Sequence, residues 1–403
     1  MNTRLLVRAS ALITLATASA IMAAQRAPSP ATHYSVTDLG SLPGGPFSQA
    51  TFVNNRNLVS GLSVAADGTQ HAVIWYHGAI ADIGVPGLGG PNSGAFGVNE
   101  RGQIDGQAET STLDPNNENF CDYFTGLECR PFRWQDGVMS ALPLLGGSNG
   151  TVANINSRGQ VAGVAENSVV DPQCPTSMAV NGTGPQVLDF KPVIWGPGKN
   201  QVRELRLLPG DSVGMALWVN DKGEAVGMSG SCANTLVPPF AIGRHAVLWK
   251  KDGSVHNLGN LGGTTNPNVL GAGNVAFAIN NKSQVTGVSV LPDGVNFHAF
   301  IWTTAAGMQD LGALPGDNLS AGLGMNNVGD IAGASIAGPD PLSGAPKAVV
   351  WHKGVIADLN TLAPDSPLYL LTAFAINNSG EIAGFGVKLS SGEVHGFLAV
   401  PRK

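Results

Sequence analysis

The stretch VAFAINNKSQVTGVSVLPDGVNFHAFIWTTAAGMQDLGALPGD, residues 275–317, contains three short blocks that decide the fold. The first is an apolar segment that ends at Asn280, with Gly287 seven residues later. The second is HAFIW (298–302), and the third is DLGALPGD (310–317). All three blocks recur along the chain, which is the signature of a repeat architecture.

The first block occurs seven times, always with seven residues between its Asn and its Gly. The pairs are Asn54–Gly61, Asn99–Gly106, Asn156–Gly163, Asn220–Gly227, Asn280–Gly287, Asn326–Gly333 and Asn377–Gly384. The copies of the second block are HAVIW (71–75), RPFRW (130–134), KPVIW (191–195), HAVLW (245–249), HAFIW (298–302), KAVVW (347–351) and HGFLA (395–399).

Each unit predicts four short antiparallel strands. In the second copy, Val98 and Phe96 stand one and three residues before Asn99, and this period of two is typical of a strand. Asn99 followed by Gly102 has the residue pattern of a type I turn, after which Ile104 begins a second strand. The second and third blocks supply the third and fourth strands.

Seven units of four strands predict an all-β fold, a seven-bladed β-propeller. The chain starts with an isolated fourth strand (34–40) and ends after a third strand (395–401). We expect the N-terminal strand to pair with the last blade, because this closes the ring and leaves no open sheet edge. A right-handed β-helix is the alternative.

Composition supports a globular protein. The 403 residues include 54 Gly and 26 Pro, and 43% are apolar and 12% charged. A disordered chain needs low hydrophobicity and high charge, and a coiled coil needs few glycines and prolines. The net charge is −6 without a basic run, which argues against nucleic acid as a partner.

The N-terminus predicts export. Arg4 and Arg8 precede the apolar stretch ALITLATA (11–18) and small residues, the pattern of a signal peptide over residues 1–24. A membrane anchor is the alternative, but the stretch is short for a bilayer. We therefore expect a linker at 25–33, one propeller domain at 34–403, no membrane span in the mature chain, and a secreted or periplasmic monomer.

The HAFIW, DLG and Asn–Gly blocks resemble the HAF repeat family of bacterial extracellular proteins. His298-Ala299-Phe300 is a complete copy of the triplet, and the likeness covers residues 34–401. The resemblance implies an exported bacterial protein and no particular reaction.

Residues that recur from blade to blade are expected to serve the fold. We expect the six tryptophans of the second block to pack between blades, and the histidines that begin it to form hydrogen bonds. The tryptophans are Trp75, Trp134, Trp195, Trp249, Trp302 and Trp351, and the histidines are His71, His245, His298 and His395.

Blades two, three and four carry insertions between their second and third strands. From the repeat Gly to the Trp position the seven blades span 14, 28, 32, 22, 15, 18 and 15 residues. The four cysteines lie in these insertions, which favours the pairs Cys121–Cys129 and Cys174–Cys232. Equivalent loops of a propeller emerge on one face, so this face is a candidate binding surface.

Six residues are candidate ligand contacts: Glu118, Asp122, Tyr123, Glu128, Arg130 and Trp218. Five lie in or beside the blade-two insertion, and Trp218 replaces a small residue beside Asn220, where it either fills a gap or lines the channel. Asp114-x-Asn116-x-Glu118 faintly resembles a calcium loop, but the Gly of such a loop is missing, so we expect no cofactor.

No catalytic motif is present, neither Gly-x-Ser-x-Gly nor His-Glu-x-x-His. The sequence therefore favours a binding protein for a glycan, a peptide or a protein. The alternatives are a propeller hydrolase or lyase that acts on a glycan, and a structural or adhesive envelope protein.

Overall fold

The computed structural model describes residues 32–174, 185–232, 243–263, 273–338 and 344–402. The predicted signal peptide (1–24) and most of the predicted linker (25–33) lie outside these residues. Within them, no helix is long and apolar enough to cross a bilayer.

Seven four-stranded antiparallel sheets form the blades of a β-propeller, as predicted. Blade one contains β2 (Ser48–Val53), β3 (Val59–Val64), β4 (Gln70–Tyr76) and β5 (Ala79–Asp82), and blade two contains β6 (Gly89–Val98), β7 (Ile104–Leu113), β8 (Leu127–Gln135) and β9 (Val138–Ala141). Blade three contains β10 (Gly146–Ile155), β11 (Val161–Val170), β12 (Leu188–Trp195) and β13 (Val202–Glu204), and blade four contains β14 (Val213–Val219), β15 (Ala225–Gly230), β16 (His245–Trp249) and β17 (Val255–Asn257).

The remaining blades follow the same order. Blade five contains β18 (Val275–Ile279), β19 (Val285–Val290), β20 (Phe297–Thr303) and β21 (Gly307–Asp310), and blade six contains β22 (Leu319–Met325), β23 (Ile331–Ile336), β24 (Lys347–His352) and β25 (Val355–Asp358). Blade seven contains β26 (Leu368–Ile376), β27 (Ile382–Lys388), β28 (Val394–Pro401) and, as its outermost strand, β1 (Tyr34–Asp38).

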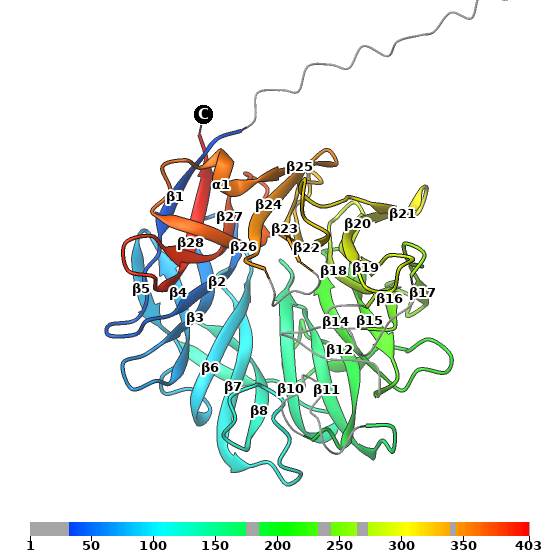
Figure 1. Cartoon of the computed structure of the whole chain (residues 1–403). Helices are drawn as coiled ribbons and strands as arrows, with labels where there is room; N and C mark the ends of the chain where they lie inside the picture. Colours follow the sequence, from blue (N-terminus) through cyan, green and yellow to red (C-terminus); the bar gives the residue numbers. More distant parts are fainter. Residues whose placement is uncertain (1–31, 175–184, 233–242, 264–272, 339–343, 403) are drawn as a thin grey trace, which may run out of the picture. The chain divides into compact units, whose positions relative to one another are not determined.

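The two ends of the propeller meet in blade seven. β1 pairs antiparallel with β28, so that Tyr34 lies opposite Pro401 and Asp38 opposite Phe397; the blue and red strands run side by side in Figure 1. The first strands of the seven blades contact one another in a closed cycle around a central channel. The predicted closure is therefore confirmed, and no blade is left with three strands.

The first strand of every blade deviates from the predicted strict alternation. Its pairing with the second strand shifts by one residue at a β-bulge, as between Ala50 and Phe52 in blade one or Ala373 and Ala375 in blade seven. A bulge places one extra residue in one strand of a pair. Val98 and Phe96 therefore do not share a face as predicted: Val98 is buried, whereas Phe96 is only half-buried.

One large aromatic ring fills the same place in each blade. Where the second block has Val in its third position, its Trp is fully buried, as in blades one, three, four and six. Where that position is Phe132, Phe300 or Phe397, the Phe is fully buried, and Trp134 and Trp302 are only half-buried. This explains why Ala399 can replace the seventh Trp.

The repeat Gly makes room for this ring. A Cβ atom on Gly163 would lie 2.3 Å from the carbonyl oxygen of Thr151 and 2.6 Å from the Trp195 ring. The buried rings join clusters that cross from blade to blade: Trp249 packs with Ala162 of blade three, and Trp351 with Ala278 of blade five. The packing role expected for the tryptophans is therefore confirmed in four blades. In the other three blades a phenylalanine of the same block takes the buried position.

One copy of the third block contains a helical turn that the sequence did not predict. In the DLNTLAPD copy (358–365), residues Leu359–Leu362 form the short helix α1, and a turn follows at 364–365. The Asp358 side chain caps it by accepting a hydrogen bond from the Asn360 N–H. Leu359 and Leu362 are buried in blade seven's cluster, which holds the turn in place.

Candidate functional site

The channel has two different ends. The turns that join first and second strands, each beginning at a repeat Asn, lie at one end, which we term the Asn-turn end. The insertions that join second and third strands lie at the other, the insertion end, because antiparallel hairpins reverse direction at alternate ends. Trp218 is next to the Val219–Ala225 pair beside its turn, so it belongs to the Asn-turn end.

The seven repeat asparagines form a closed ring. In each blade the Asn Nδ2 donates to the backbone carbonyl of the corresponding Asn in the next blade, over 3.0–3.1 Å. The last of these bonds runs from Asn377 to Asn54 and completes the circle. All seven asparagines are buried. The sequence predicted only their turn role.

Six of these side chains donate a second hydrogen bond, to the side chain four residues later; Asn54, which has Leu58 there, does not. The Asn280 Oδ1 accepts from the N–H groups of Lys282 and Gln284, and its second amide hydrogen goes to Gln284 Oε1 at 2.8 Å. An asparagine side chain offers two donors and two acceptors, so nothing remains unsatisfied. Aspartate lacks the donors, which accounts for the recurrence of Asn in all seven copies.

A second ring, formed by the residue after each Asn, surrounds the mouth. The N–H of one member donates to the side chain of the next in six of the seven junctions. Its members are Asn55, Glu100, Ser157, Asp221, Asn281, Asn327 and Asn378. Burial alone would raise the pKa of Asp221, but hydrogen bonds from Ser157 and Asn281 outweigh burial and lower it.

The two rings enclose a cavity of about 230 Å³ at the Asn-turn end. Trp218 and Phe52 line it from opposite sides of the channel, with ring centroids 5.3 Å apart. Trp218 thus lines the channel and also fills part of it, because it packs against the apolar clusters of blades four to six. The lining contains the carboxylates of Glu100 and Asp221 and no Lys, Arg or His.

The insertion of blade two packs down at the insertion end. Phe120, Cys121 and Tyr123 share one apolar cluster with Leu217 of blade four and Phe277 of blade five. The segment therefore packs into an apolar cluster with the neighbouring blades and does not stand free as an exposed binding loop.

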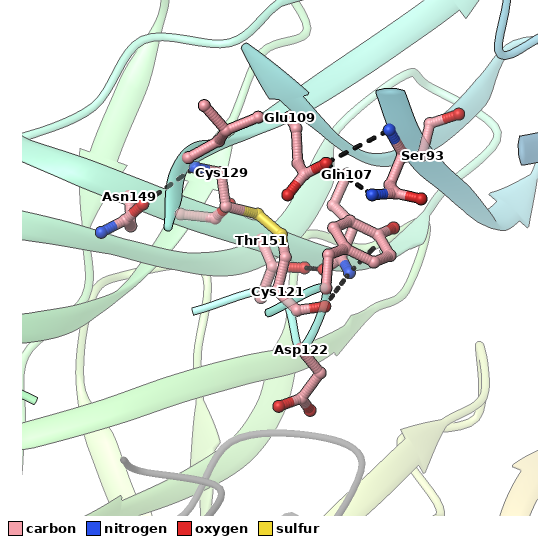
Figure 2. The surroundings of a disulfide bond; sticks show 12 residues. Ser93, Gln107, Glu109, Cys121, Asp122, Cys129, Asn149 and Thr151 are labelled. Atoms are coloured by element: carbon pink, nitrogen blue, oxygen red, sulfur yellow. Dashed lines mark hydrogen bonds between the residues drawn. A yellow bond between two sulfur atoms is a disulfide. The ribbon is translucent and has the colours of Figure 1, made fainter. Parts of the chain in front are cut away.

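Hydrogen bonds fix this segment on both sides, as Figure 2 shows. The Tyr123 hydroxyl lies 3.3 Å from Nε2 of both Gln107 and Gln70, the latter in blade one. Gln107 Nε2 also donates to the Cys121 carbonyl, and Thr151 of blade three donates to Gln107 Oε1 at 2.5 Å. Burial raises the pKa of Tyr123, so its hydroxyl is neutral.

Glu118 joins the insertion to blade three. Its Oε1 accepts from the N–H groups of Val187 and Leu188 and from the Gln186 amide, and its side chain is buried. The same amide donates to Glu166. Burial, followed by repulsion between the two acids, raises the pKa of Glu166, and burial also raises that of Glu118.

The other predicted contacts lie at the edge of this segment. Asp122 is half-buried and points away from the disulfide in Figure 2. Arg130 Nη1 lies 3.9 Å from Glu128 Oε2, whereas its buried Nε has no hydrogen-bond partner among the residues that the structure describes. The structure thus gathers Glu118, Asp122, Tyr123, Glu128 and Arg130 at the insertion end and places Trp218 at the opposite end. Their role in ligand binding stays a prediction.

Both disulfides have the predicted pairing. Cys121 bonds Cys129 within the blade-two insertion, and Cys174 bonds Cys232 between the insertions of blades three and four. Asp171 lies close to the second pair, but sulfurs joined in a disulfide are not thiolate ligands. In the calcium-like segment, Asp114 accepts from the N–H groups of Asn116 and Glu118 and from Asn149, so its oxygens are occupied by hydrogen bonds.

The histidines of the second block pair with aspartates. Nδ1 lies 2.6–2.9 Å from a carboxylate oxygen in His71–Asp82, His245–Asp211, His298–Asp310 and His395–Asp38. The expected hydrogen-bonding role is confirmed. Lys347 makes the equivalent contact with Asp317 at 2.6 Å, which shows that the position requires a long cationic or hydrogen-bonding side chain.

Comparisons with known proteins establish the fold alone. No family model and no curated protein matches the chain. Among solved structures, an oligogalacturonate lyase in complex with manganese is 10% identical, with a TM-score of 0.51, over 93% of this chain and 95% of that one. YCF48 bound to a D1 peptide is 11% identical, with a TM-score of 0.47, over 93% of this chain and 100% of that one.

Proposed function

We propose that the protein is an exported ligand-binding propeller whose site is the cavity at the Asn-turn end. One observation carries this proposal: the cavity combines two aromatic side chains with a rim of amides and carboxylates. Ligand sites typically pair apolar walls with a few placed polar groups.

The rim still offers free hydrogen-bonding groups. Asn327 and Asn378 each use their Oδ1 in the second ring, but neither Nδ2 donates to a described group. Glu100 uses Oε1 for Asn55 and leaves Oε2 open. Donors, acceptors and negative charge around aromatic rings suit a neutral or cationic polyhydroxyl or amine ligand, such as the terminal residue of a glycan.

Export and membership in the HAF repeat family belong to the same proposal. Two disulfides among the described residues support an oxidising compartment, in which such bonds persist. Seven copies of the Asn–Gly block and the His–Asp pairs support the family resemblance.

The proposal is tested by calorimetric titration of the mature, oxidised chain with neutral mono- and disaccharides, amines and Ca²⁺. We expect one ligand to bind, and Glu100→Gln to weaken its binding about ten- to a hundredfold, because loss of one charge-assisted hydrogen bond costs about 1.5–3 kcal/mol. Glu204→Gln, an exposed acid on β13, is the matched control. No binding, or equal affinity in both variants, would refute the assignment.

The same titrations separate the two other functions. A glycan that binds and is then cleaved would support a hydrolase or lyase, for which acids near the bound sugar supply acid–base chemistry. A chain that binds none of the probes but retains cells or envelope material would support a structural or adhesive role. We favour binding, because Trp218, Phe52 and Glu100 are unlike residues gathered at one mouth.

A further inference from the structure

One arginine occupies a position that is apolar in every other blade. The fourth residue of the second block is Ile74, Arg133, Ile194, Leu248, Ile301, Val350 or Leu398 in blades one to seven. The six apolar residues all belong to hydrophobic clusters within or between blades. Arg133 is half-buried and therefore puts a guanidinium where the repeat puts a methyl-bearing side chain.

A cavity of about 250 Å³ lies at this arginine, between blades two and three. Its walls are β9 of blade two and the hairpin loop 196–201 of blade three, with Trp195 and Leu142 among its apolar lining. This loop has six residues, whereas the corresponding loops of blades one and six have two. The longer loop forms a wall that these two blades lack.

The cavity is positively charged. Arg133 and Lys199 line it, and no acidic residue does. Neither cation forms a salt bridge or a side-chain hydrogen bond with any described residue. Asp105 is opposite Arg133 in the β7–β8 ladder, but its carboxylate turns to the Gly97 N–H, and no ion pair forms.

A partly buried cation without a counterion is costly, because a charge loses solvation when it leaves water. The other blades show that this fold needs no charge at the position. From the arginine, the cavity and the uniformly positive lining, we infer that the space between blades two and three binds a small carboxylate anion. The planar guanidinium accommodates a carboxylate through two parallel hydrogen bonds.

Polar groups beside the arginine complete the site. The Ser140 hydroxyl and the Gln201 Nε2 amide line the same cavity, and Gln201 uses its Oε1 to accept from the Gly198 N–H. A ligand with a carboxylate and one or two hydroxyl groups would satisfy both the cations and these neutral groups. This site shares no residue with the channel cavity and does not depend on the function proposed for it.

The test is calorimetric titration of the oxidised chain with citrate, malonate and inorganic phosphate at constant ionic strength. We expect a carboxylate to bind, and Arg133→Met to reduce its affinity at least tenfold. Because six blades carry an apolar residue here, Arg133→Met should fold, which its circular dichroism and melting temperature verify. Lys199→Gln, at an exposed position, should weaken binding about threefold without affecting the fold.

Arg56→Met is the matched control, since Arg56 is an exposed arginine in the turn between β2 and β3 of blade one and does not line this cavity. Unchanged affinity in this variant together with the loss in Arg133→Met would support the site. Equal affinity in wild type and Arg133→Met, or no binding of any carboxylate, would overturn it. Binding of phosphate alone would overturn the assignment to carboxylates.

Discussion

At the Asn-turn end of the channel, seven copies of one residue hold seven blades together through identical hydrogen bonds. At the insertion end, one irregular segment of blade two reaches to blades one, three and four, and two disulfides restrain the surrounding insertions. The first end is built by repetition, and the second by a unique sequence. Repetition supplies a rigid frame, while residues that interrupt it, such as Trp218 and Arg133, create the cavities.

The largest expected effect distinguishes the two disulfides of the insertion end. Cys174–Cys232 closes a segment of 58 residues, and Cys121–Cys129 one of 8. The chain-entropy relation gives about 4 kcal/mol for the longer segment and about 2.5 kcal/mol for the shorter. Cys174→Ala/Cys232→Ala should therefore lower the free energy of unfolding more than Cys121→Ala/Cys129→Ala does, measured by denaturant titration. Equal losses would contradict this account.

The Asn ring is tested by Asn280→Asp. The substitution removes the donors to Asn326 and Gln284 and places negative charge against a carbonyl, so we expect a loss of about 1–3 kcal/mol. Asn260→Asp is the control, because the exposed Asn260 only accepts from the Gly262 N–H, as an aspartate also can. If both variants unfold alike in denaturant, the ring contributes nothing specific.

Blade two contains a buried acid, Asp105, whose ionisation should make stability depend on pH. Asp105 is fully buried, its Oδ2 has no partner, and burial raises its pKa from 3.8 to about 7. Its contribution to stability is fully present below about pH 4 and is lost as pH rises to 7, since the unfolded chain ionises first. Asp105→Asn should match wild type at pH 4 and exceed its free energy of unfolding by about 4 kcal/mol at pH 8. A difference in melting temperature between wild type and Asp105→Asn that stays constant from pH 4 to pH 8 would show that Asp105 does not cause the pH dependence.

The smallest effect concerns the outer His–Asp pairs, which belong to neither end. His298 and Asp310 have side-chain exposures of 18% and 44%. A pair so accessible to solvent contributes little, so His298→Asn should cost no more than about 0.5–1 kcal/mol in thermal unfolding. A larger loss would show that these pairs stabilise the frame as the Asn ring does.

The features that could be predicted from the sequence are those that recur in every repeat. Seven Asn–Gly pairs and seven second blocks were enough for the blade count, the closure through residues 34–40 and the placement of the cysteines. The Asn ring was missed because its bonds join residues 45 to 323 positions apart. The sequence contained one indication of the ring: the position is Asn in all seven copies, whereas a simple turn would also accept Asp or Ser.

The cavities were harder to foresee, since they depend on how unlike residues meet. Trp218 was singled out correctly as an exception to its repeat, although alternation alone did not place it at the end opposite the insertions. In RPFRW, Arg130 was predicted to contact a ligand and Arg133 was not. Arg133, however, holds the fourth position, which is apolar in all other copies. Glu118 was predicted to contact a ligand, and its burial was not foreseen, because burial by a loop that folds back has no periodic signature.

The pairing of β1 with β28 makes blade seven depend on two distant parts of the chain. Asp38 and His395 lie 357 residues apart in sequence but 2.7 Å apart in the folded chain. β1 is therefore synthesised long before its partner, whereas each of the other six blades takes its four strands from one continuous stretch of chain. A chain truncated before residues 394–401 presents an unpaired edge at β1 and β27 that invites association with other chains.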